Sequence, residues 1–274
     1  KIYELCESLS HTPGELTNLA QSVIDEDYLN DKKWAADLFQ KAIDTALDSD
    51  EMRSVAESIS GEWRGLNDKK LGKEIFTKSL ELADEFNGLK NIADSVCSED
   101  YLNDKDWGRK VYDMAKSKAQ TANDYLNLAQ SYADEDVLND NKTAKELLDI
   151  AIERSDEDNN QYKFIAETIS ENRYLGDKDW ARTVYEMALN TASRVWDYSS
   201  IAESVLNEDY LNDKDWAREI FQLAVEKAEN QDELDSIAES VEREWGFNDP
   251  KWAKEIRAGK GGSTSAQSAP EPET

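Results

Sequence analysis

Carboxylates are the most prominent side chains in this sequence that could bind a metal ion or act as general acids and bases. The 274 residues include 60 aspartates and glutamates, but one histidine, His11, and two cysteines, Cys6 and Cys97. These few histidine and cysteine side chains exclude a zinc cluster and most histidine-based mechanisms. The sequence also lacks a Gly-rich phosphate loop and a nucleophile elbow. We therefore expect no enzymatic activity and no cofactor.

The carboxylates are concentrated in one recurring type of segment, such as residues 25–27, 134–136 and 208–209. Clustered carboxylates suit Ca²⁺, which takes six to eight oxygen ligands, but the glycine and glutamate spacing of a calcium-binding helix-loop-helix segment is missing. Negative charge ahead of the positive N-terminus of a helix is the alternative explanation, and we favour it. The weak calcium candidates are Asp25, Asp27, Glu208 and Asp209.

The same segments mark an internal repeat. The motif Leu-Asn-Asp, or a close variant of it, occurs seven times at spacings of 36 or 37 residues. The copies begin at Leu29, Leu66, Leu102, Leu138, Leu175, Leu211 and Phe247. A fixed period of this length is typical of stacked repeats. We predict one continuous array of about seven repeats over residues 1–258.

Each repeat predicts two helices. Between Leu234 and Val241, apolar residues recur at i, i+3, i+4 and i+7, one stripe of a helix that we name helix A. A longer apolar stripe beginning at Trp216 predicts helix B. Pro250 takes a place that the other copies fill with Lys or Asn, and proline favours the first helical position. The preceding aspartates are then predicted N-caps: Asp31, Asp68, Asp104, Asp140, Asp177, Asp213 and Asp249.

Five repeats carry a tryptophan three residues after the capping aspartate. These residues are Trp34, Trp107, Trp180, Trp216 and Trp252. We interpret them as anchors between repeats, because a tryptophan buries a large apolar area.

The spacing of both helices resembles the tetratricopeptide repeat superfamily, in a form with a longer period. The residues that carry the resemblance in one copy are Ala217, Phe221 and Ala224 of helix B, and Leu234, Ile237, Ala238 and Val241 of helix A. The family's glycine after the helix-A leucine is alanine here, and its proline after helix B is missing. The resemblance implies an all-α fold, a right-handed α-solenoid in which helix A lines the inner surface.

The resemblance places one polar position of helix A along a concave groove. Glu239 lies about 150° from the centre of the apolar stripe. The equivalent residues form an acidic and amide ladder: Gln21, Glu57, Asp94, Gln130, Glu167, Glu203 and Glu239. We expect a basic or amide-rich extended peptide as its ligand. A polar helix face exposed to solvent is the alternative.

The two ends of the sequence depart from the repeat. Aligning Lys1 to Val23 with a later repeat starts the chain inside a helix B, so its first helix is truncated and Cys6 takes the buried place of Ala224. Residues 259–274 are small and polar, and we expect a disordered, low-complexity tail.

The net charge of −28 argues against nucleic-acid binding, and no apolar run is long enough for membrane insertion. We expect a non-enzymatic scaffold that binds a basic protein or peptide. One alternative is a structural protein, an acidic surface or filament component that self-associates end to end and that calcium could stabilise. Another is an acidic inhibitor that acts as a decoy for a basic protein. The sequence indicates no compartment.

Overall fold

The computed structural model describes residues 1–243 and 246–259, and these residues form 15 α-helices and no strand. The all-α prediction is confirmed. The predicted tail, apart from Gly259, lies outside the described residues. The chain divides into two compact units, residues 1–148 and 149–274.

Helices A and B alternate along the chain. The helices A are α2 (Pro13–Ile24), α4 (Ser49–Ser60), α6 (Phe86–Cys97), α8 (Ala122–Ala133), α10 (Asn159–Ser170), α12 (Val195–Leu206) and α14 (Gln231–Glu242). The helices B are α1 (Ile2–Leu9), α3 (Lys32–Thr45), α5 (Lys69–Leu82), α7 (Lys105–Lys116), α9 (Asn141–Glu153), α11 (Lys178–Thr191), α13 (Lys214–Lys227) and α15 (Pro250–Arg257).

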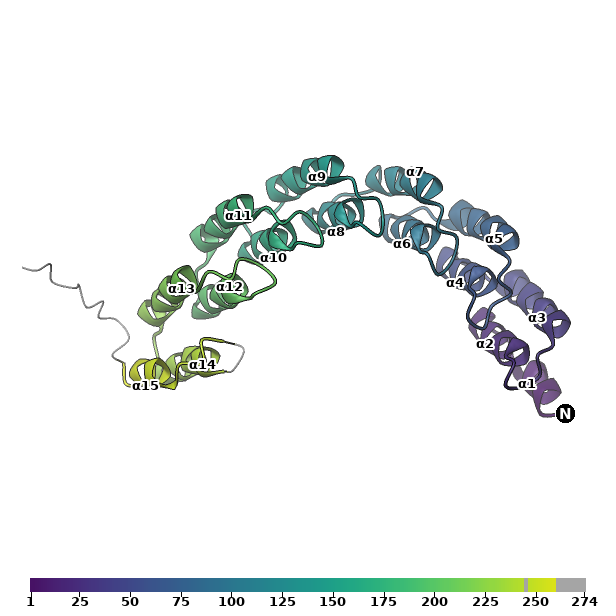
Figure 1. The fold of residues 1–274 in the computed structure, drawn as a ribbon, viewed down its shortest axis with the longest axis horizontal. Coiled ribbons are helices and arrows are strands. Elements are labelled where there is room, and N and C mark those ends of the chain that lie inside the picture. The colour runs from purple at the N-terminus through teal and green to yellow at the C-terminus, as the bar shows by residue number, and fades with distance from the viewer. Residues whose placement is uncertain (244–245, 260–274) are drawn as a thin grey trace, which may run out of the picture. The chain divides into compact units, whose positions relative to one another are not determined.

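Neighbouring helices pack in pairs within each unit. In the first unit α2 packs on α3, α4 on α5, and α6 on α7; in the second, α10 packs on α11, α12 on α13, and α14 on α15. Successive repeats meet through their helices A, as α2 meets α4 and α10 meets α12, and also through helix B and the next helix A, as α3 meets α4 and α11 meets α12. Within each unit the even-numbered helices form one row and the odd-numbered helices another (Figure 1).

Small residues allow the two helices of a repeat to approach closely. The alanine of helix A that the resemblance aligns with the family's glycine is fully buried in every repeat, for example Ala93 and Ala238. Gly108 of α7 lies so close to Cys97 that a methyl group there would collide with the Cys97 Sγ. Burial raises the pKa of Cys97 to about 12, so this thiol stays protonated at neutral pH.

The recurring Leu-Asn-Asp motif is a left-handed turn followed by a helix cap. Its asparagine has a positive φ in six repeats: Asn30, Asn67, Asn103, Asn139, Asn212 and Asn248. Gly176, with φ of +61°, takes this place in the remaining repeat. Asparagine and glycine are the residues that tolerate this conformation best. The turn lets the N–H of Asp31 donate to the Val23 carbonyl oxygen at 3.0 Å, which ties the loop to helix A.

The predicted burial of Cys6 is wrong. Helix α1 buries none of its residues, and Cys6 is exposed. Ala224, its counterpart on α13, is fully buried where α13 packs against α12. Among the described residues no helix covers α1 in that way.

Candidate functional site

The predicted capping aspartates lie at helix N-termini and accept the N–H three residues later. The acceptors are Asp31, Asp68, Asp104, Asp140, Asp177, Asp213 and Asp249, at 2.9 to 3.3 Å. Several of them use the second oxygen to bind a cation of the preceding repeat. These pairs are Lys73 with Asp104 (2.6 Å), Arg109 with Asp140 (2.7 Å), Arg182 with Asp213 (2.7 Å) and Arg218 with Asp249 (3.0 Å).

Three of these cations also lie over a predicted tryptophan anchor. The distances from the cation to the ring centroid are 5.0 Å for Lys73 and Trp107, 4.1 Å for Arg182 and Trp216, and 4.0 Å for Arg218 and Trp252. Trp216 and Trp252 are buried, with exposed fractions of 9% and 7%, whereas Trp34, Trp107 and Trp180 are partly exposed. The cap, the cation and the ring therefore form one joint between repeats.

The predicted groove residues join neighbouring helices A. A ladder residue of one repeat hydrogen-bonds a serine of the next, 37 or 38 residues later. The pairs are Gln21 with Ser58 (3.2 Å), Glu57 with Ser95 (2.6 Å), Asp94 with Ser131 (3.4 Å) and Glu167 with Ser204 (2.7 Å). All of these ladder residues are half-buried, as are Gln130 and Glu203, while Glu239 is exposed. Most of the ladder thus lies partly inside the seam between helices A.

Glu167 is the ladder residue with the most perturbed environment. Its Oε1 accepts from Ser204, whose hydroxyl is also 2.6 Å from the Tyr185 hydroxyl. Burial raises the pKa of Glu167 above its ordinary value, although the Ser204 hydrogen bond and the charge of Lys163 act in the opposite direction.

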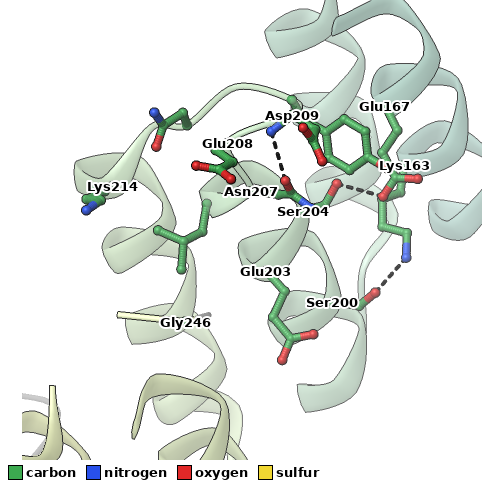
Figure 2. A pocket seen from close by; sticks show the side chains of 13 residues that line it. Lys163, Glu167, Ser200, Glu203, Ser204, Asn207, Glu208, Asp209, Lys214 and Gly246 are labelled. Atoms are coloured by element: carbon green, nitrogen blue, oxygen red, sulfur yellow. Dashed lines mark hydrogen bonds between the residues drawn. The ribbon is translucent and has the colours of Figure 1, made fainter. Parts of the chain in front are cut away.

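A cavity of about 760 Å³ opens beside this part of the ladder in the second unit. Four carboxylates line it: Glu167, Glu203, Glu208 and Asp209. Figure 2 shows Glu203 on α12 and Glu208 and Asp209 in the loop that follows α12. Lys163 also lines the cavity and donates to Ser200 at 2.7 Å. Within the described residues, the carboxylates of Glu203, Glu208 and Asp209 have no hydrogen-bond or ion-pair partner.

A second cavity, of about 730 Å³, lies at the equivalent place in the first unit. It is formed by α2, α4 and the loops after α4 and α6, which correspond to α10, α12 and the loops after α12 and α14. Its carboxylates are Glu57, Glu62, Glu99 and Asp100, and its aromatic residues are Trp63 and Tyr101.

A tyrosine lines each cavity, Tyr101 in the first unit and Tyr210 in the second. Burial and the nearby Glu57 and Asp100 carboxylates raise the pKa of Tyr101. Burial and Glu167, together with Glu171 and Asp209, raise the pKa of Tyr210, which lines the other cavity. Each tyrosine resists ionisation because it is partly buried and because its phenolate would face existing negative charge.

The weak calcium candidates lie in the acidic loops from helix A to helix B. In residues 1–243 and 246–259, no group of three or more His, Cys, Asp or Glu side chains is placed to hold a metal ion. Asp25 instead accepts the Asp27 N–H at 3.0 Å and pairs with Arg64 at 2.6 Å. Glu208 and Asp209 line the acidic cavity of the second unit. The weak calcium candidates gain no support.

Sequence reasoning missed the pairing of ladder residues with serines and the cavities beside them. The small polar residue that follows each ladder residue was a usable signal, since Ser or Thr recurs there in all seven repeats. Trp63 gave no signal, because it lies in a loop that departs from the repeat.

No protein-family model matches this chain, and no curated protein sequence matches it. None of the helices in the described part of the chain has the length and apolar composition needed to cross a membrane.

Proposed function

We propose that this protein is a non-enzymatic interaction scaffold that binds basic, extended segments of a partner protein. The observation that carries the proposal is the recurrence of a cavity lined by four carboxylates at the same place in the repeat in both units. A repeat array that carries such a site more than once suits an extended ligand.

The architecture that fits this function is a right-handed, tetratricopeptide-like solenoid with the row of helices A on its concave side. Pairwise packing of helices A and B and their separation into two rows within each unit support it. The net charge of −28 would attract a basic partner and accelerate its association at low salt. An acidic inhibitor of a basic protein would use the same surface.

The unpaired carboxylates of the cavity in the second unit, residues 149–274, provide the direct test. The triple variant Glu203→Gln, Glu208→Gln, Asp209→Asn removes three charges that have no structural partner. Its matched control is Glu219→Gln, Glu226→Gln, Glu229→Gln, which removes the same charge from exposed positions on and after α13. The probe is a fluorescent arginine-rich peptide, followed by anisotropy at low and moderate salt.

We expect the cavity variant to weaken peptide binding and the control to retain it. Equal weakening in both variants would show that the net charge alone attracts the peptide, and the proposed site would be wrong. Absence of binding to the unmodified protein would reject the function itself.

A second candidate function is end-to-end self-association, which the exposed apolar face of α1 supports. Ile2, Leu5 and Leu9 are among the most exposed large apolar residues of the described chain. A second copy packing on this face would bury them. Sedimentation velocity should then show association that depends on concentration and that Ile2→Ser with Leu5→Ser abolishes.

A further inference from the structure

The loop between α4 and α5 departs from the repeat. It has eight residues, 61–68, whereas every other loop from helix A to helix B has seven. Arg64 in this loop has φ of +55°, a left-handed conformation that arginine seldom adopts. The adjacent Trp63 is 77% exposed, the most exposed tryptophan in the described residues. The irregular loop therefore holds an indole ring in solvent.

The exposed indole stands between two acidic cavities. Trp63 and Glu62 line both the cavity of about 730 Å³ and a neighbouring one of about 450 Å³. The carboxylates around them are Glu57, Glu99 and Asp100 in the larger cavity, and Asp25, Glu26 and Asp27 in the smaller. Water poorly solvates an exposed indole, whereas a cation on its face is attracted by the ring's quadrupole.

A cation of the chain itself shows how this surface holds a guanidinium group. The Arg64 guanidinium carbon lies 4.6 Å from the Trp63 ring centroid, and its Nε is 2.6 Å from the Asp25 carboxylate. One guanidinium thus receives both an aromatic face and a carboxylate. In the larger cavity, the carboxylates of Glu62, Glu99 and Asp100 have no hydrogen-bond or ion-pair partner within the described residues.

We propose that Trp63, with Glu62, Glu99 and Asp100, forms a binding site for an arginine side chain of the partner. This inference rests on the proposed function and deepens it, since it names the anchoring side chain of the basic segment. Arginine fits better than lysine because a planar guanidinium stacks on an indole and donates two parallel hydrogen bonds to a carboxylate. A lysine ammonium is a more strongly hydrated point charge.

The test uses two labelled peptides of equal length and charge, one with arginine and one with lysine at each basic position. Trp63→Ala is compared with Trp196→Ala, which removes another exposed tryptophan, 61% exposed, that lines neither cavity. Thermal unfolding of both variants by circular dichroism checks the fold. Because both rings are largely exposed, we expect their melting temperatures to match that of the unmodified protein.

Trp63→Ala should weaken binding of the arginine peptide about 2- to 30-fold, the range of a cation–π contact, and binding of the lysine peptide less. Trp196→Ala should bind both peptides as the unmodified protein does. If Trp63→Ala leaves the arginine peptide unaffected while the unmodified protein still binds it, the arginine site is refuted and the scaffold function survives. If the unmodified protein binds neither peptide, both proposals fail.

Discussion

Arg218 and Asp249, 31 residues apart, join two successive repeats by a 3.0 Å ion pair. The Asp249 carboxylate also accepts the Trp252 N–H at 2.9 Å, and the Arg218 guanidinium lies 4.0 Å from the centroid of the Trp252 ring. A single aspartate therefore caps its own helix and fixes the cation of the repeat before it. The cation in turn covers the ring that packs between the repeats.

The first prediction concerns the buried anchors. Trp216→Ala should lower the free energy of unfolding by about 3–5 kcal/mol, because it removes a ring that is only 9% exposed. Urea denaturation measures the loss, and hydrogen exchange should quicken mainly in α11 and α13. Trp34→Ala, at a partly exposed site, should cost less. Equal losses at both sites would contradict the burial-based argument.

The second prediction separates the two roles of a capping aspartate. Asp213→Asn retains a side-chain oxygen for the Trp216 N–H and weakens the pair with Arg182, so it should cost at most about 1 kcal/mol. Asp213→Ala removes both interactions and should cost about 1–2 kcal/mol. Chemical denaturation of the two variants gives the comparison. A loss of stability larger than about 1 kcal/mol in the asparagine variant would show that the ion pair with Arg182 contributes more than the helix cap.

The third prediction uses the raised pKa of Glu167. Burial raises this pKa in the folded protein above the ordinary 4.5. As pH rises from 4.5 through the folded pKa, the side chain ionises more readily in the unfolded chain, so the folded protein loses stability. Glu167→Gln keeps an oxygen that accepts from Ser204 and carries no charge. Its melting temperature should therefore equal or exceed that of the unmodified protein at pH 7, and the difference should shrink towards pH 4. Marked destabilisation at pH 7 would contradict the assignment.

The fourth prediction concerns Asp197, a buried carboxylate at the start of α12. Burial acts to raise its pKa, but the backbone amides of Arg194 and Ser193 and the Arg194 guanidinium outweigh it and lower the pKa from 3.8 to about 2. A lowered folded pKa stabilises the protein above pH 3.8, by about 2 kcal/mol, and this contribution disappears as pH falls towards 2. Acid titration of stability should be shallower in Asp197→Asn. An unchanged profile would contradict the prediction.

The helices and their caps follow from short-range patterns, which explains why the sequence predicted them. The apolar spacing from Leu234 to Val241 fixes one face of a helix, and Pro250 fixes the start of the next. The left-handed turn was not predicted, although Gly176 in the place of an asparagine was a usable signal for it. These signals all lie within a few residues of the structure they determine.

The cavities could not be predicted in the same way. The hydrogen bond from Ser204 to Glu167 depends on the rotation between successive repeats, which no local spacing specifies. The exposure of Trp63 results from one extra loop residue and a left-handed Arg64, both exceptions to the period that guided the prediction. The prediction that Cys6 is buried was wrong because the alignment assumed a covering helix that the described structure lacks.

The constant separation of the joint residues has a consequence for the gene. Partners such as Arg182 and Asp213, or Glu167 and Ser204, lie 31 or 37 residues apart, so each contact reaches only the adjacent repeat. Recombination that duplicates or deletes one whole repeat brings residues of the same types together at the new junction. Ala36, which stands where Lys73 stands one repeat later, shows that the array tolerates a joint without its cation. The number of repeats can therefore change between descendants of this gene without the evolution of a new interface.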